Sequence, residues 1–424
     1  MNKILVIGAG VDKTKGIDMP LARELIPEIA KFSEEDGKEI EKTIKSFLPN
    51  LRFSFNKFIK DSIESIIQTD KNKLNKIINE LESINVNNEK DNNLINLLKK
   101  LFEKLVNIQE GVKLDDETYD MIKKVLGEEI EKEIEDESII EFSKISFTDS
   151  FKVVMKKVLK KSIEEPENPI SKVISLHFLD IESLLIKTFL GFYNQNVPDI
   201  KRYLYISWML WAYLKKRENN VFENISKDNS LPFYSKIPED FRVISFNYTT
   251  FLSKVLNSDR YLYFHGSLDE YIRLDTRDLL SFEGISVLEI LNEFVKPNIN
   301  LDKEEYVIPA IIPPLKLKPV LSNKFIETWF KANQWIKESE KVVIIGYSFN
   351  YADEHFNDII RTYKDKQFYI IDPDAENLRK RLERIFMLNE NCFTNTKIQG
   401  FETFKCGKVS IIKTKADEIE LDKL

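Results

Sequence analysis

The stretch Ile4-Leu5-Val6-Ile7-Gly8-Ala9-Gly10 decides how the N-terminal part of the chain folds. Four consecutive apolar residues followed at once by glycine are typical of a buried parallel strand that ends in a tight turn. Gly16 and Pro20 interrupt the loop that follows. Because proline is tolerated in the first turn of a helix, we expect a helix to begin near residues 19–21. This stretch therefore predicts the first strand of an α/β sheet.

Strand-like runs return after residue 236, with helical patterns between several of them. The strand-like runs are Phe241–Phe246, Tyr261–Phe264, Tyr306–Ile312, Val342–Ile345 and Gln367–Ile371. The helical patterns cover Thr249–Leu256, Phe325–Glu338, Asp353–Tyr363 and Ala375–Phe386. Alternating strands and helices indicate a parallel sheet with helices on both faces. With the strand at residues 3–7 added, the sequence predicts an α/β fold with a Rossmann-like, doubly wound parallel sheet.

The residues between these two parts have a different character. Segments such as Ile40–Phe47, Leu74–Leu81 and Leu94–Val106 repeat apolar residues every three or four positions, with Lys and Glu between them. That spacing is the period of an amphipathic helix. We therefore predict a Rossmann-like domain assembled from residues 1–24 and 236–424, interrupted by a large all-α insertion domain at residues 25–235. The acidic run Glu128–Glu137 is interpreted as a solvated helix face.

Composition and charge narrow the possible environments and partners. The 424 residues include 63 basic and 70 acidic side chains, a formal net charge of -7. That balance argues against broad, non-specific nucleic-acid binding. No apolar stretch approaches the roughly 18 residues of a membrane-spanning helix, and no signal-peptide pattern is present. We expect a soluble, cytoplasmic protein that does not contact membranes or bind nucleic acid directly.

The cysteines and histidines are too few and too scattered for a metal site. Cys392 and Cys406 are the two cysteines, whereas a structural zinc site normally takes four Cys or His ligands at short paired spacings. Two of the three histidines, His177 and His355, fall on predicted helices, and we interpret them as structural. We therefore expect no metal and no disulfide framework, which fits a reducing cytosol.

Several polar turns come directly after predicted strands, at the edge of an open α/β sheet where ligands bind. In Gly8-Ala9-Gly10-Val11-Asp12 the glycines let the backbone approach a pyrophosphate, although a tight turn without a ligand would look the same. Asn247 either holds a bound carboxamide, ribose hydroxyl or water, or caps the helix that follows it. His265 suits proton transfer near neutral pH, or it acts as a structural hydrogen-bonding group.

Two further turns follow later strands. Gly346-Tyr347-Ser348 is a second glycine-containing turn, suited to the other side of a pyrophosphate. Asp372 comes directly after the next strand, where an acidic residue commonly binds an adenosine ribose. Asp374, two residues later, is interpreted as the cap of the helix that begins at Ala375. These turns predict that a dinucleotide extends along one edge of the sheet.

The order of these motifs resembles the bacterial sirtuin-like domains found in anti-phage defence systems. It runs Gly-Ala-Gly, Gly-Ile, Pro, a long helical insertion, Ser-Phe-Asn-Tyr, Phe-His-Gly-Ser, Ile-Ile-Pro-Pro at residues 311–314, and Gly-Tyr-Ser. The resemblance covers residues 1–24 and about 236–380, and the insertion matches only in position and helical character. It implies that NAD+ binds in the crevice of the sheet, as a substrate, and that the bond between nicotinamide and ribose is cleaved.

By position, the resemblance makes Asn247 the catalytic asparagine and His265 the catalytic histidine. The residues that match its nucleotide-binding turns are Gly8, Ala9, Gly10, Gly346 and Ser348. Thr249 is a notable departure, because sirtuins and many relatives carry Asp two residues after the asparagine. Threonine can still donate and accept hydrogen bonds, so we predict that Thr249 contacts NAD+. Asp12 and Asp372 complete the residues predicted to bind it.

The leading hypothesis is an NAD+ glycohydrolase that releases ADP-ribose and nicotinamide, as the effector of an anti-phage abortive-infection system. The alternative is a regulatory or scaffold subunit that binds NAD+ or ADP-ribose without turnover, which Thr249 favours. A protein deacylase is less favoured, because the zinc module that frames its peptide groove is missing. The family also implies a homo-oligomer and a separately encoded partner such as a HerA-type ATPase, with the helical insertion as the natural contact surface.

Overall fold

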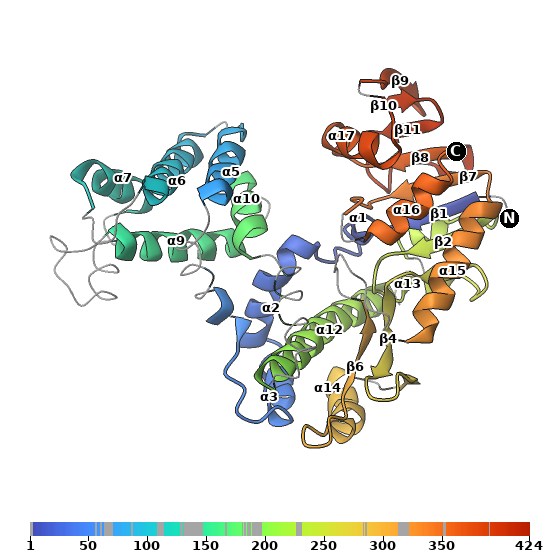
Figure 1. Cartoon of the computed structure of the whole chain (residues 1–424), viewed down its shortest axis with the longest axis horizontal. Helices are drawn as coiled ribbons and strands as arrows, with labels where there is room; N and C mark the ends of the chain where they lie inside the picture. The colour runs from blue at the N-terminus through green and yellow to red at the C-terminus, as the bar shows by residue number, and fades with distance from the viewer. Residues whose placement is uncertain are drawn as a thin grey trace. The chain divides into compact units, whose positions relative to one another are not determined.

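The computed structural model divides the chain into two compact units (Figure 1). Unit 1 comprises residues 1–22, 32–51 and 182–424, and unit 2 comprises residues 23–31 and 52–181. The structure describes residues 3–55, 57–59, 62, 71–85, 88–107, 114–127, 130, 147–165, 168–179, 181, 184, 188, 197–225, 231–282, 284, 286–312, 322–350, 353–389 and 391–424. The predicted domain boundaries at residues 24 and 235 stay a prediction.

Within the described residues, unit 1 contains an eight-stranded sheet that is mostly parallel. Its strands are β1 (Lys3–Ile7), β2 (Phe241–Ser245), β3 (Tyr261–Tyr263), β7 (Lys341–Ile345), β8 (Gln367–Ile371), β9 (Thr394–Ile398), β10 (Phe401–Cys406) and β11 (Val409–Ile412). They lie in the order β3-β2-β1-β7-β8-β11-β10-β9, and β10 runs in the opposite direction to the other strands of this sheet. The strand order reverses at β1, between β2 and β7, as in doubly wound nucleotide-binding folds. The predicted fold class is confirmed.

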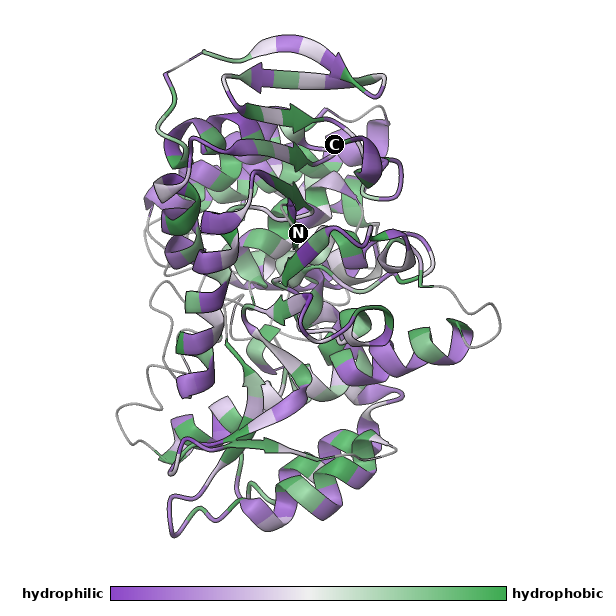
Figure 2. Cartoon of the chain, turned by 90° about the vertical axis from the view of Figure 1, so that its right-hand side faces the viewer, coloured by the Kyte–Doolittle hydropathy of each residue, from purple (hydrophilic) through white to green (hydrophobic). Residues whose placement is uncertain are grey.

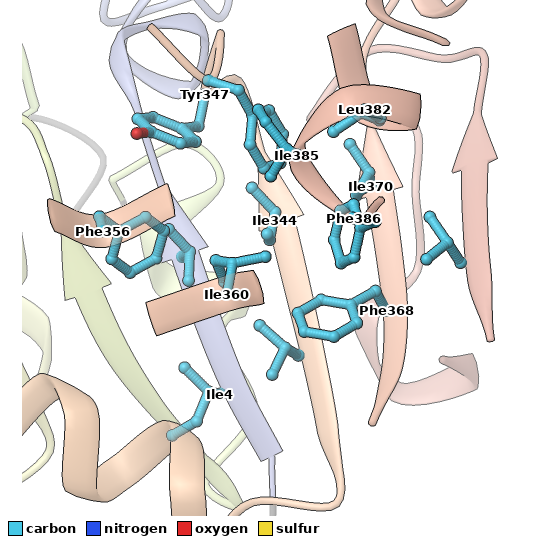
Figure 3. Close-up of a cluster of buried hydrophobic side chains, with 14 of the residues drawn as sticks. Ile4, Ile344, Tyr347, Phe356, Ile360, Phe368, Ile370, Leu382, Ile385 and Phe386 are labelled. Carbon is cyan, nitrogen blue, oxygen red and sulfur yellow. The ribbon is translucent and has the colours of Figure 1, made fainter. Parts of the chain in front are cut away.

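Apolar side chains on the strands make the core of this sheet, and helices cover them. Figure 3 shows Phe356 and Ile360, from α16 (Glu354–Thr362), near the strands that carry Ile4 and Ile344. On the next strand, Phe368 packs edge-on against Phe386, with ring centroids 4.8 Å apart. Two more helices of unit 1 contribute to the same core, α15 (Asn323–Glu338) and α17 (Ala375–Ile385). Figure 2 shows the strands as mainly hydrophobic (green) where helices lie over them.

A second, three-stranded sheet corrects one prediction. β5 (Leu279–Ser281), β4 (Gly266–Arg273) and β6 (Val307–Ile311) form an antiparallel sheet in the order β5-β4-β6. We predicted the run at residues 306–312 as part of the parallel sheet, and that is wrong. A short apolar run indicates a strand but does not specify its partner. Here β4 begins one residue after His265, and the chain therefore turns away from the parallel sheet before β6 is reached.

Tryptophans of the long helix α12 (Val197–Ile225) hold this second sheet. The indole of Trp208 donates a hydrogen bond to the carbonyl of Val307 at 3.1 Å, and that of Trp211 donates to Leu268 at 2.8 Å. The rings of Trp208 and Tyr271 are stacked, with centroids 5.9 Å apart. α12 and α3 (Lys38–Ser46), which lie between the predicted domain boundaries, therefore belong to unit 1.

The chain becomes helical earlier after β1 than we expected. α1 (Ala9–Asp12) begins directly after Gly8, whose carbonyl accepts a hydrogen bond from Val11 N at 3.0 Å. The helix predicted near residues 19–21 is instead a short 3₁₀ helix at Ala22–Glu24 that leads into α2 (Leu25–Glu34). One early turn of helix is possible because Gly8 carries no side chain into the adjoining turn of the sheet edge. Asp12 is thereby placed at the end of α1.

The regular elements of unit 2 are helices in the part of the chain that the structure describes. Its helices include α5 (Lys71–Glu82), α6 (Glu89–Asn107), α7 (Asp116–Leu126), α9 (Phe147–Glu164) and α10 (Pro169–Phe178). The stacked rings of Phe102 and Phe178 join α6 to α10. His177 Nε2 lies 2.8 Å from Glu80 Oε2, in agreement with the structural role predicted for this histidine. The acidic run at residues 128–137, apart from Ile130, lies outside the described residues.

Candidate functional site

The register of the parallel sheet places the predicted turns side by side at its carboxyl edge. Ile7 at the end of β1 pairs with Ser245 of β2 and with Ile345 of β7. Ser245 in turn pairs with Tyr263 of β3, and Ile345 pairs with Ile371 of β8. The residues that follow these five strand ends are Gly8, Phe246, Phe264, Gly346 and Asp372. At about 4.8 Å between strands, the five ends span roughly 19 Å along the carboxyl edge of the sheet.

The two predicted nucleotide-binding turns pack directly against each other at the point where the strand order reverses. Gly10 N donates to the carbonyl of Gly346 at 3.0 Å. A Cβ atom on Gly10 would lie 2.7 Å from Gly346 Cα, and a Cβ atom on Gly346 would lie 2.7 Å from Gly10 Cα. Gly346 also has φ +62°, in the left-handed region that favours glycine. The close approach of the two turns thus accounts for Gly10 and Gly346, whether or not a ligand binds there.

Asn247 lies in a loop and does not cap the helix that follows. α13 (Phe251–Val255) begins four residues later, and Thr250 occupies its N-cap position. The backbone N–H of Asn247 donates to Ser245 Oγ at 3.1 Å, while its side-chain Nδ2 donates to the carbonyl of Gly8 at 3.1 Å. Asn247 is buried, with 7% of its surface exposed. Its side chain therefore links the loop after β2 to the turn after β1.

Asp12 is a buried carboxylate at the centre of a hydrogen-bond cluster. Thr249 Oγ1 donates to Asp12 Oδ2 at 2.7 Å, and the hydroxyl of Tyr234 donates to Asp12 Oδ1. The side chain of Asn247 lies close enough to the same carboxylate to favour its charged form. Burial raises the pKa of Asp12 to about 6, against the hydrogen bonds from Tyr234 and Thr249 and the nearby side chain of Asn247, which lower it. This carboxylate therefore changes charge close to neutral pH.

His265 is paired with a carboxylate that the sequence analysis did not single out. His265 Nε2 lies 3.0 Å from Asp353 Oδ1, and both residues are buried. The ring of Phe246 meets the imidazole edge-on, with centroids 4.9 Å apart. Tyr347 OH donates to Asp353 Oδ2 at 3.3 Å, and burial beside that carboxylate raises the pKa of Tyr347 well above its usual value. An imidazole held between aromatic rings and a carboxylate is suited to exchanging a proton in a dry environment.

The remaining predicted contacts lie at the ends of β7 and β8. Arg381 of α17 donates to the carbonyl of Ser348. Asp372 Oδ1 accepts a hydrogen bond from the backbone N–H of Asp374 at 2.7 Å, and burial raises the pKa of Asp372. Asp374 occupies the N-cap position of α17, but its side chain makes no capping hydrogen bond and accepts instead from Asn377. Asp372 is therefore held by the backbone beside the predicted adenosine position.

A second buried network lies beside the Asp12 cluster. Glu218 of α12 is fully buried and accepts hydrogen bonds from the backbone N–H and, at 3.0 Å, the hydroxyl of Thr250. Lys215 lies 2.7 Å from the same carboxylate and 2.5 Å from Asp269. Although Lys215 lowers the pKa of Glu218, burial dominates and raises it. This network fixes the loop that carries Asn247 and Thr249.

Three residues of the site escaped the sequence analysis: Tyr234, Glu218 and Asp353. Tyr234 and Glu218 come from the region predicted as helical insertion, where nothing in their neighbourhood marks them. Asp353 stands at the start of a predicted helix and looks like an ordinary cap. Each meets its partner across 32 to 222 residues of sequence or from a different strand end, and single-sequence patterns carry no signal of such pairings. Residues 313 and 314 of the Ile-Ile-Pro-Pro motif lie outside the described residues.

Other sequence-based expectations concern metals, membranes and cysteines. Among the described residues, no group of three or more His, Cys, Asp and Glu side chains could hold a metal ion, and no helix is long and apolar enough to cross a membrane. The expectation about cysteines needs a correction, since Cys392 and Cys406 form a disulfide. The β9–β10 hairpin brings them together, with Cα atoms 5.5 Å apart. Spacing along the sequence alone does not reveal that approach.

Comparison with known proteins gives a partial structural match. No protein-family model and no curated protein matches the sequence. Among solved structures, the chain is similar to one described as "Structural Basis for the Mechanism and Regulation of Sir2 Enzymes". The sequence identity is 18%, the match covers 49% of this chain and 74% of that chain, and the TM-score is 0.29. The similarity thus extends over about half of the chain.

Proposed function

We propose that this protein hydrolyses NAD+ to ADP-ribose and nicotinamide. The observation that carries the proposal is the convergence of Asn247, Asp12 and His265 with two glycine turns on the carboxyl edge of the sheet, where the strand order reverses. Ligands of open α/β sheets bind at that place. The motif order that resembles sirtuin-like domains supplies the identity of the ligand, and the clustered polar side chains support chemistry on it.

The reaction needs one bond broken, one bond formed and one proton removed. The bond between the nicotinamide nitrogen and ribose C1′ breaks, and nicotinamide leaves with the bonding electron pair as a neutral molecule. Water forms a bond to C1′ and loses a proton. His265 Nε2 lies 3.0 Å from Asp353 Oδ1, so this carboxylate is placed to orient the imidazole, and in this proposal His265 accepts the proton from water or from a ribose hydroxyl. In this proposal Asn247 positions the group that loses it.

Nicotinamide release from NAD+ by the purified protein tests this assignment. We expect Asn247→Ala and His265→Ala each to lower the rate at least 100-fold, which is the usual contribution of a positioned acid or base. His355→Ala is the matched control, since His355 is exposed on α16 and should leave the rate unchanged. The rate is measured with the chain alone and with the product of a neighbouring gene. Hydrolysis that survives both site substitutions contradicts the proposal.

The second candidate is a subunit that binds NAD+ or ADP-ribose without turnover. Thr249 favours it, because threonine stands where the resemblance expects a carboxylate. Calorimetry of NAD+ binding, combined with analysis of released nicotinamide, distinguishes the two candidates. Tight NAD+ binding without nicotinamide release, in the presence of every partner tried, supports the binding subunit. A protein deacylase would instead release nicotinamide only when an acyl-lysine peptide is added.

A role in anti-phage defence would follow from the proposed activity. Hydrolysis of NAD+ after infection would deplete the cell of the dinucleotide and stop phage production, which is abortive infection. A homo-oligomer and a partner such as a HerA-type ATPase belong to this proposal and rest on the resemblance of the motifs alone. Cytoplasmic location belongs to it for the same reason, since NAD+ of the cytosol would be the substrate.

A further inference from the structure

We propose that Asp12 is the positioning residue for Asn247, and that it makes Asn247 present its amide carbonyl oxygen to the ligand. The inference rests on the proposed function, because it concerns the group that Asn247 offers in the same site. Sequence reasoning assigned Asp12 to contact with NAD+. Its carboxylate instead accepts hydrogen bonds from two side chains of the protein, Tyr234 and Thr249, and the amide of Asn247, which donates to the carbonyl of Gly8, lies near it.

The orientation of the Asn247 amide follows from what surrounds its nitrogen. The carbonyl of Gly8, 3.1 Å away, can only accept a hydrogen bond, and an ionised Asp12 can only accept as well. The NH2 group of Asn247 must therefore face both, and the carbonyl oxygen occupies the opposite end of the planar amide. That oxygen binds a hydrogen-bond donor. A water molecule, a ribose hydroxyl or an amide N–H fits this requirement, whereas a phosphate or a carbonyl does not.

Asp12 can hold Asn247 in this way because its own two oxygens are fixed separately. Tyr234 donates to Oδ1 and Thr249 donates to Oδ2 at 2.7 Å, so the carboxylate cannot rotate without losing one of them. Thr249, two residues after Asn247, is therefore the hydrogen-bond donor, and Asp12 supplies the carboxylate that accepts from it. The cluster thus still contains one carboxylate. It comes from the turn after β1, at Asp12, whereas the resemblance expects it in the loop after β2, at position 249.

Protonation of Asp12 would loosen this arrangement. A protonated carboxyl must donate from one oxygen, and at least one of the three donors around it then loses its acceptor. Burial places that change at a pH of about 6. The ionisable groups that face Asp12 from neighbouring elements are Tyr234, from the 3₁₀ helix Tyr234–Lys236, and Glu218 of α12. Tyr234 stays protonated because its pKa is raised well above 10, and the charge of Glu218 raises the pKa of Asp12.

The pH profile of nicotinamide release tests the proposal. For the unmodified chain we expect the rate to fall about tenfold per pH unit below a pH near 6. Asp12→Asn should lower kcat by about 10- to 100-fold, with a smaller change in KM, and should remove that acid limb. Tyr234→Phe removes a hydrogen bond that favours the charged carboxylate, so the acid limb of its pH profile should move to higher pH. A purely structural role for Asp12 would not move the limb.

Exchanging Asp12 and Thr249 tests whether activity can be rescued. The double variant Asp12→Thr with Thr249→Asp puts the carboxylate on the other end of the same hydrogen bond, and it should recover part of the activity that Asp12→Thr alone loses. Folding of every variant is checked by tryptophan fluorescence. If the unmodified chain shows no turnover, the same pH series is run on NAD+ binding by calorimetry, where the midpoint should move in the same direction in Tyr234→Phe.

The outcomes separate this inference from the proposed function. An inactive Asn247→Ala variant together with an Asp12→Asn variant of unchanged rate and pH profile overturns the inference and leaves the proposed function standing. An active Asn247→Ala variant overturns both. An unshifted acid limb in a folded Tyr234→Phe variant also contradicts the inference, since Asp12 would then not be the group that titrates.

Discussion

At the level of single residues, the buried carboxylate of Asp12 links the stability of unit 1 to pH. The pKa of Asp12 is raised from 3.8 to about 6, so between these values the folded chain holds a proton that the unfolded chain has released. The stabilising contribution of this protonated group is therefore present below about pH 4 and is lost as pH rises to about 6. The shift corresponds to about 3 kcal/mol at 1.36 kcal/mol per pKa unit.

We expect the free energy of unfolding of the unmodified chain, relative to Asp12→Asn, to fall by up to about 3 kcal/mol between pH 4 and pH 7. Denaturant titrations at several pH values, followed by tryptophan fluorescence, measure this difference. All four tryptophans, at positions 208, 211, 329 and 335, belong to unit 1, so the signal reports on the unit that contains Asp12. A difference that does not change with pH would contradict the assigned protonation.

Sequence patterns singled out the candidate site residues better than the partners of those residues. Asn247 and His265 were found because both follow strand ends and both are residue types with recognisable chemistry. Their partners Asp12, Tyr234 and Asp353 are assigned by distances of a few ångströms between side chains that lie far apart in sequence. Asp12 is an example. The sequence predicts its position in the turn after β1, but it does not predict that Tyr234 and Thr249 contact it.

At the level of elements, the contact between the turns after β1 and β7 predicts the effect of adding a single methyl group. Gly346→Ala places a Cβ atom 2.7 Å from Gly10 Cα at a φ of +62°. We expect a loss of about 2–4 kcal/mol in unfolding free energy, from the left-handed backbone together with the forced separation of the turns. Nicotinamide release should fall with it, because Gly8 and Asn247 share this edge.

Gly400→Ala is the matched control for that substitution. Gly400 has φ +87°, and nothing lies within 4 Å of its Cβ position. It should therefore lose only the backbone contribution of about 1–2 kcal/mol, with nicotinamide release unchanged. Equal losses in the two variants, measured by the same denaturant titration, would show that the close approach of the turns contributes nothing.

The elements that sequence patterns predicted are those with continuous apolar runs. β1, β2, β7 and β8 lie inside the parallel sheet and β3 lies at its edge, and all five were predicted within one residue at their starts. β4, β5, β9, β10 and β11 were missed, and among them the exposed Thr394–Ile398 and the mixed Gly266–Arg273 carry no such run. The antiparallel pairing of β6 could not be predicted, since its partner β4 had not been recognised.

At the level of the whole molecule, the two units should unfold separately. Each has its own buried core, with the parallel and antiparallel sheets in unit 1 and packed helices in unit 2. We expect denaturation followed by far-ultraviolet circular dichroism, which reports helices of both units, to deviate from the single transition seen by tryptophan fluorescence. Two coincident transitions would contradict this prediction, because coincidence is the mark of a single cooperative unit.

The central position of β1 has a consequence for the synthesis of the chain. β1 is synthesised before both of its neighbours in the sheet, which are β2, at residues 241–245, and β7, at residues 341–345. At about 5–20 residues per second, a ribosome takes roughly 12–50 s to reach β2 from β1. During that interval an apolar strand with both edges unpaired is exposed on the nascent chain. The insertion that separates the two halves of the sheet thus delays the pairing of β1 until β2 has been synthesised.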